Sequence, residues 1–174
     1  MKTLSFLILL LCSITLSQAQ TESIQQFYNK YKNLEEVTHI KLQGWVLQLA
    51  AKHADDDEAN KIFKKITQLR FLNMEEGNPV STDEMSKLLH SLRKDNFEEL
   101  IQIRDEGEQI NCFIRSKEDL ITDVVLLISG SDEFLLLSLE GKLRFSDLND
   151  LDLEVKGSEQ FKKLPDDRSK LPRA

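Results

Sequence analysis

The side chains best suited to chemistry are widely scattered along this chain. Its three histidines, His39, His53 and His90, form neither an H-x-H nor an H-x-x-x-H pair. A transition-metal site needs several His or Cys ligands that converge. The sequence also contains no P-loop, no G-x-G-x-x-G turn and no G-x-S-x-G nucleophile elbow. We therefore expect no metal site and no cofactor-binding residues, and we expect the histidines to be isolated.

The densest group of oxygen ligands is the acidic run at residues 55–58, which reads Asp-Asp-Asp-Glu. An EF-hand calcium loop would need Gly at its sixth position and Glu at its twelfth. Counted from Asp55, those positions hold Asn60 and Ile66. Acidic residues also suit a helix N-terminus, because its free N–H groups attract negative charge. The run predicts a helix start, and Asp147, Asp150 and Asp152 predict the polar face of another short helix.

Cys112 is the one candidate nucleophile outside the N-terminal segment. It alternates with Ile110 and Ile114, so it shares their face of an expected strand, and a free cysteine packs as a small hydrophobe. A catalytic role would require a base and an orienting group beside it. The chain has 30 acidic residues, and no pair of them is distinguished as an acid–base pair. We expect Cys112 to be buried, and we expect no catalytic residues.

Trp45 is the only tryptophan and follows Gly44. The expected role is an anchor in the hydrophobic core. The alternative is an anchor in an interface, since tryptophan is enriched among the residues that contribute most to binding.

The first nineteen residues predict a secretory signal peptide. Lys2 supplies a positive start, an apolar run extends from Leu4 to Leu16, and residues 17–19 read Ser-Gln-Ala, a pattern that a signal peptidase cleaves after Ala19. The run is shorter than the ~20 residues of a membrane-spanning helix. A lipid anchor on Cys12 is disfavoured because Leu11 precedes it, where a small residue is expected. We expect export to the periplasm or the extracellular space.

Removal of residues 1–19 leaves Cys112 as the only cysteine, so the expected mature domain has no intramolecular disulfide. The full chain carries a formal net charge of −7, which disfavours nucleic acid as a partner.

Helical periodicity dominates the first half of the remaining chain. Helices are expected at 22–33 and 44–53, from the acidic run to Ile66, and after Ser81. At Ser81, Glu84 completes a capping box, and Val80 and Met85 form a hydrophobic staple. A strand is expected at 67–73, and 37–42 is open between strand and helix.

The second half has the period of strands, and short turns predict a four-stranded antiparallel meander. Its strands are expected at Leu100–Arg104, around Ile110–Ile114, at Leu120–Ser129 and at Phe134–Leu139, with Gly141 ending the last. A short helix capped by Ser146 and carrying Leu148 and Leu151 follows. The fold class is therefore α+β: N-terminal helices packed on a mainly antiparallel sheet of four or five strands. We expect one domain over 22–155 and a polar, disordered tail at 156–174.

This order of parts resembles the family known as domain of unknown function 4252, found in exported proteins of Bacteroidota. The resemblance spans about residues 24–153 and is most specific from Leu137 to Leu151. It is carried by the following segments: the helix of Trp45, the acidic-opened helix ending at Ile66, the capped helix after Ser81, Glu98–Ile101, the meander Val124–Leu139 and the stretch Leu137–Leu143. It implies a small α+β domain of the cell envelope and brings no catalytic residues.

Taken together, these features favour a non-enzymatic exported domain that binds another cell-envelope protein. The alternative is a module that binds a small ligand or a lipid on the apolar face of its sheet.

Overall fold

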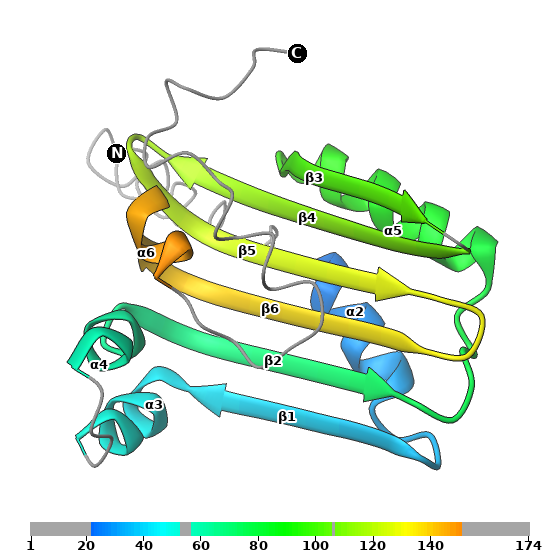
Figure 1. Ribbon diagram of the computed structural model, residues 1–174, viewed down its shortest axis with the longest axis horizontal. Coiled ribbons are helices and arrows are strands. Elements are labelled where there is room, and N and C mark those ends of the chain that lie inside the picture. The colour runs from blue at the N-terminus through cyan, green and yellow to red at the C-terminus, as the bar shows by residue number, and fades with distance from the viewer. Residues whose placement is uncertain (1–21, 53–56, 106, 151–174) are drawn as a thin grey trace, which may run out of the picture.

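Six strands form one antiparallel sheet in the computed structural model, which describes residues 22–52, 57–105 and 107–150 (Figure 1). The expected signal peptide and tail, and Leu151, lie outside these residues. The α+β class is confirmed, with six strands where four or five were expected. The elements are α2 (Glu22–Tyr31), β1 (Val37–Gln43), α3 (Gly44–Ala51), α4 (Asp57–Phe63), β2 (Ile66–Met74), α5 (Thr82–Lys94), β3 (Glu98–Asp105), β4 (Glu108–Lys117), β5 (Leu120–Ser129), β6 (Phe134–Leu143) and α6 (Phe145–Asn149).

The expected meander is present as β3, β4, β5 and β6, each antiparallel to the next. The additional strands come from the β1–β2 hairpin, in which β2 pairs with the free side of β6. The order across the sheet is therefore β1-β2-β6-β5-β4-β3. This order leaves β1 and β3 as the two edge strands.

One face of the sheet, here called the α2/α5 face, is covered by α2 and α5 (Figure 1). Both helices bury a single apolar stripe, as their periodicity predicts. The stripe of α2 is Ile24, Phe27, Tyr28 and Tyr31, and the stripe of α5 is Met85, Leu88, Leu89 and Leu92. The stripes pack on Leu72, Phe113, Val125, Leu127, Phe134 and Leu136 of the strands.

The opposite face, here called the second face, is equally apolar. It presents Ile110, Cys112 and Ile114 of β4, Val124, Leu126 and Ile128 of β5, and Leu135, Leu137 and Leu139 of β6. Leu47 of α3, Ile62 of α4, and Phe145 and Leu148 of α6 pack on it. These three helices stand at one end of the strands, where β1 ends, β2 begins and β6 ends (Figure 1).

The start of α5 matches its sequence signature in full. The Ser81 hydroxyl accepts a hydrogen bond from the Glu84 N–H at 3.2 Å, and the Glu84 carboxylate accepts one from the Ser81 N–H at 3.3 Å. Val80 and Met85, the two residues of the hydrophobic staple, are both buried in the α2/α5 cluster. Such a capping box fixes where the helix begins.

Three expected boundaries are wrong. Ile66 does not end a helix but opens β2 opposite Gly141, because α4 already ends at Phe63. Gly141 does not end the fourth strand, which continues to Leu143. The N-cap of α6 is Arg144 and not Ser146, because the Asp147 carboxylate accepts a hydrogen bond from the Arg144 N–H at 2.7 Å.

Gly141 is required by a close approach of two backbones. A Cβ atom at this position would lie 2.4 Å from the Lys65 carbonyl oxygen and 3.1 Å from the Ile66 Cα. Both are backbone atoms, so neither can move aside cheaply. The residue therefore marks where β6 passes the junction of α4 and β2, and its absence of a side chain is what allows the strand to continue.

We expect Gly141→Ala to lower the free energy of unfolding by about 1–3 kcal/mol, because the added methyl overpacks this junction. Urea denaturation followed by circular dichroism measures the loss. Gly130→Ala is the matched control, since its Cβ would meet the flexible Glu133 side chain at 3.3 Å. Equal midpoints for the two variants would contradict the requirement for glycine.

Candidate functional site

The structure keeps the described histidines apart. His39 lies exposed on β1, with its ring edge-on to Tyr28 at a centroid distance of 6.2 Å. His90 is exposed on α5, and His53 lies outside the described residues. Within the described ranges, no three or more His, Cys, Asp or Glu side chains gather as a metal site would require.

Asp147 has a structural role. It is buried rather than on a polar face, and its carboxylate also accepts a hydrogen bond from Lys65 Nζ at 2.5 Å. This ion pair ties α6 to the start of β2. Asp150 is the C-cap of α6, while Asp152, Asp55 and Asp56 lie outside the described residues. Asp57 begins α4, as the acidic run predicted.

Cys112 is fully buried in the apolar cluster of the second face, as expected. Burial raises the pKa of its thiol from 9.0 to about 12, because the thiolate would lose its hydration. A nucleophilic cysteine needs the opposite shift. Cys112 is therefore a core residue.

We expect Cys112 in the folded protein to resist a thiol-specific reagent at pH 8 and to react stoichiometrically after denaturation. Stability is expected to fall as the pH rises from 9 toward 12, because the unfolded thiol ionises in that range and the folded thiol does not. Labelling monitored by mass spectrometry checks the first expectation. Rapid labelling of native protein would refute the buried assignment.

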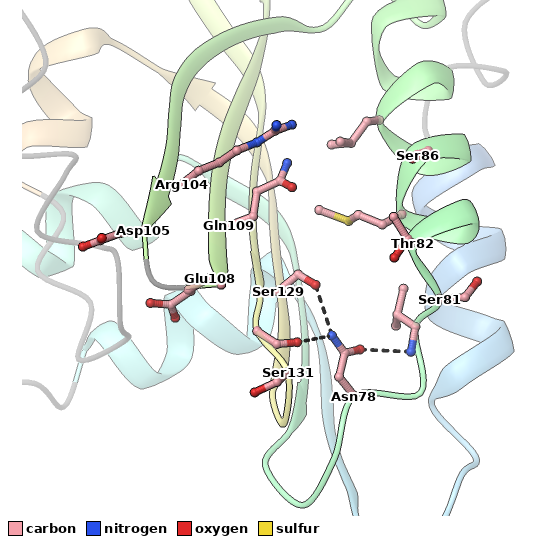
Figure 2. Close-up of a pocket in the computed structure, with 15 residues that line it drawn as sticks. Asn78, Ser81, Thr82, Ser86, Arg104, Asp105, Glu108, Gln109, Ser129 and Ser131 are labelled. Atoms are coloured by element: carbon pink, nitrogen blue, oxygen red, sulfur yellow. Dashed lines mark hydrogen bonds between the residues drawn. The ribbon is translucent and has the colours of Figure 1, made fainter.

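A cleft of about 780 Å³ lies between α5 and the two hairpins at the far end of the sheet from α6 (Figure 2). Arg104 and Gln109 project into it from the β3–β4 hairpin and face the first turns of α5 (Figure 2). Ser129 and Ser131 line it from the β5–β6 hairpin, and Met85 and Leu89 line it from α5. The volume would suit a small ligand.

Asn78, one of the polar residues that line the cleft, makes three hydrogen bonds to its surroundings. The Asn78 amide donates to the Ser129 hydroxyl at 3.1 Å and to the Gly130 carbonyl at 2.8 Å. Its oxygen accepts from the Val80 N–H at 2.9 Å. Asn78 thereby joins the start of α5 to the β5–β6 turn. The residues that line the cleft include no histidine or cysteine, so among the described residues it contains no nucleophile paired with an imidazole base.

The prediction that Trp45 anchors the hydrophobic core is wrong, because 69% of its surface is exposed. On the same side of α3, four residues later, Leu49 is 52% exposed. Leu47 and Ala51, on the other side of the helix, are buried. Sequence reasoning gave an interface anchor only as the alternative, because α3, which reads Gly-Trp-Val-Leu-Gln-Leu-Ala-Ala, is apolar around most of its circumference. Such a helix gives no sign of which side faces the core.

A third exposed apolar side chain lies on β1, the strand that leads into α3. Ile40 on β1 is 43% exposed. In register with Phe71, it points to the second face of the sheet, on which α3 also packs. Ile40, Trp45 and Leu49 are here called the β1/α3 apolar surface. β1 is an edge strand, and in Figure 1 no described element lies beyond it.

The two edges of the sheet differ in chemistry. On β3 the most exposed side chains are Glu98, Gln102, Arg104 and Asp105, which are all polar. Charged edge residues are a common means of preventing a further strand from pairing. On β1 the exposed side chains are likewise mostly polar, but they include Ile40 at the centre of the strand, which is 43% exposed. The β1 edge is therefore the better candidate for contact with another chain.

The fold defines the class of protein: an α+β domain with an open antiparallel sheet. The chain belongs to the family described as a domain of unknown function (DUF4252), whose model matches residues 31–151. The match runs from the last residue of α2 through α6. No curated protein and no solved structure matches the chain. Within the described residues, no helix is both long and apolar enough to cross a bilayer.

Proposed function

We propose that this protein is an exported, non-enzymatic domain that binds a protein partner of the cell envelope through the β1/α3 apolar surface. The observation that carries the proposal is the exposure of Trp45, at 69%, beside the free edge of the sheet. Tryptophan is one of the side chains enriched at the energetic centre of protein interfaces.

The geometry suits a partner segment in extended conformation. An edge strand leaves one side of its backbone N–H and C=O groups available, and an added strand can pair with them. β1 offers seven residues for such pairing. Side chains at alternate positions of the added strand would lie beside Ile40, and those beyond its end would reach Trp45. Backbone pairing supplies affinity in this mode, and the side-chain contacts supply specificity.

A non-enzymatic role agrees with the chemistry of the described residues. Cys112 is buried with a raised pKa, the described histidines stand apart, and Asn78 of the cleft is hydrogen-bonded to Ser129, Gly130 and Val80. The binding of a lipid is a weaker alternative, because the cleft has a mixed lining of serines, charged side chains and a few apolar residues. Acyl chains favour pockets lined predominantly by apolar groups.

The binding surface can be tested in the native cells with a photo-crosslinking amino acid placed at position 45. We expect crosslinks to one specific envelope protein, and we expect Ile40→Lys to reduce them at least about tenfold, because a lysine on an edge strand opposes pairing. Leu34, which is 45% exposed in the loop before β1, provides the matched control position. Crosslinks from position 45 that equal those from position 34 would refute the surface.

Export can be tested independently of the partner. We expect the protein recovered from its native cells to begin at Gln20, since the residues before it carry the pattern that signal peptidase recognises. Cell fractionation with N-terminal sequencing measures both the compartment and the first residue. Intact protein in the cytoplasm that still begins at Met1 would exclude export.

A further inference from the structure

The cleft between α5 and the two hairpins receives a cation that the fold does not use. Arg104 projects into it from β3 (Figure 2). Among the described residues it has no carboxylate partner, because the six ion pairs there all involve other cations. A guanidinium has five N–H donors and no acceptor. The free donors of Arg104 therefore suit an anionic ligand.

The acidic residues that line the cleft are directed away from its interior. Asp105 and Glu108 stand opposite each other in the β3–β4 ladder, next to the opposed pair Arg104 and Gln109. Successive side chains of a strand point to opposite faces. Arg104 and Gln109 accordingly face α5, and Asp105 and Glu108 point the other way, as Figure 2 shows. Of the described lining residues, the one charged group that faces the interior is thus positive.

The acidic residues in the first turn of α5 are held by cations outside the cleft. Asp83 accepts a hydrogen bond from Lys87 Nζ at 2.6 Å, and Glu84 forms an ion pair with Lys30. Neither acid lines the cleft. A ligand inside it would therefore meet the charge of Arg104 first.

Gln109, which stands opposite Arg104, is oriented by a buried hydrogen-bond network. Its Nε2 donates to Asn111 Oδ1 at 2.7 Å, and the fully buried Asn111 donates to Glu99 at 2.7 Å. Arg93 completes the network with a bond to Glu99 at 2.8 Å. Because Asn111 holds the nitrogen of the Gln109 amide, the oxygen of that amide is left to accept a hydrogen bond from a ligand.

The other walls of the cleft offer uncharged hydroxyl groups and a small apolar area. Thr82 and Ser86 lie four residues apart on α5, so their hydroxyls share one side of the helix. Ser129 adds a hydroxyl from the β5–β6 hairpin, and Met85 and Leu89 supply apolar contacts. Hydroxyls both donate and accept, so they suit the hydroxyl groups of a ligand. The apolar contacts suit the C–H face of a sugar ring.

We propose that this cleft binds a small hydroxylated carboxylate, such as a sugar acid. The carboxylate accepts hydrogen bonds from Arg104, and a hydroxyl of the ligand donates to the Gln109 oxygen. An amino acid fits less well, because its ammonium group would find no carboxylate that faces the interior. The volume of about 780 Å³ lies within the range of small-ligand sites.

This site is separate from the proposed partner-binding surface. The cleft receives Arg104 from β3, and the β1/α3 apolar surface lies at β1, on the opposite edge of the sheet. The inference therefore stands or falls independently of the proposed function.

The ligand class can be tested by nuclear magnetic resonance with the isotope-labelled protein. Titration with glucuronate, galacturonate and gluconate is expected to shift the amide signals of Gln109 and Ser86 with at least one of these acids. We expect glucose to bind at least about tenfold more weakly, because it lacks the charge that Arg104 pairs with. Equal binding of glucose, shifts confined to other surfaces, or no binding of any of the three acids would overturn the inference.

Two variants test the assigned contacts. Arg104→Gln removes the cation, and Gln109→Glu gives the guanidinium an internal partner without a change in size. We expect each to weaken binding of the acid at least about tenfold. Lys117→Gln and Gln43→Glu are the matched controls, since they make the same charge changes at residues that do not line the cleft. Circular dichroism verifies that all four variants are folded, and equal affinities of variants and controls would overturn the inference.

Discussion

The structure depends on one constraint: the central strands are apolar on both faces. The whole run Val124–Ile128 of β5 is buried, and so is Phe134–Leu137 of β6. Successive side chains of a strand point to opposite faces, so these runs place hydrophobic surface above and below the sheet. Burial of a large aliphatic side chain contributes about 1.5–3 kcal/mol. The helices on the α2/α5 face and the helices at one end of the second face both cover part of this hydrophobic surface.

The buried charged side chains of the strands are paired across neighbouring strands, and these pairs help to determine how the strands align. Arg115 and Asp123 stand directly opposite each other on β4 and β5, and the guanidinium Nη2 lies 2.7 Å from the carboxylate. The same carboxylate accepts from the Thr122 hydroxyl at 2.6 Å. On β2, the buried Arg70 contacts Glu140 at 2.5 Å. Breaking such a pair would leave one buried charge without a partner, which is costly, so a shift in strand register is strongly disfavoured.

The sequence predicted the parts of this fold that depend on local chemistry. The capping box at Ser81, the stripe of α2 and the strand Leu120–Ser129 follow from hydrogen bonds and periodicities within a few residues. The errors lie where distant segments meet. Ile66 continues a helical pattern, but pairing with β6 makes it a strand residue. A glycine such as Gly141 is typical of a strand end, yet here it allows the strand to pass close to the Lys65 backbone. The exposure of Trp45 could not be predicted because α3 is apolar around most of its circumference. That β1 is an edge strand follows only from the pairing of β2 with β6.

That exposure bears on the role of the domain because it does not help the fold. A tryptophan or leucine on the surface gains little of the free energy that burial would provide, and an isoleucine on an edge strand favours unwanted pairing. Other exposed positions carry polar side chains instead. The exposed residues of β3 are polar, and the outer side chains of α5 include Lys87, His90 and Arg93. Isolated exposed apolar residues are ordinary on proteins. Three of them lie within ten residues, on or beside the edge strand that exposes an isoleucine. Together they form a surface that a partner can cover, and this is the physical reason for proposing that binding occurs there.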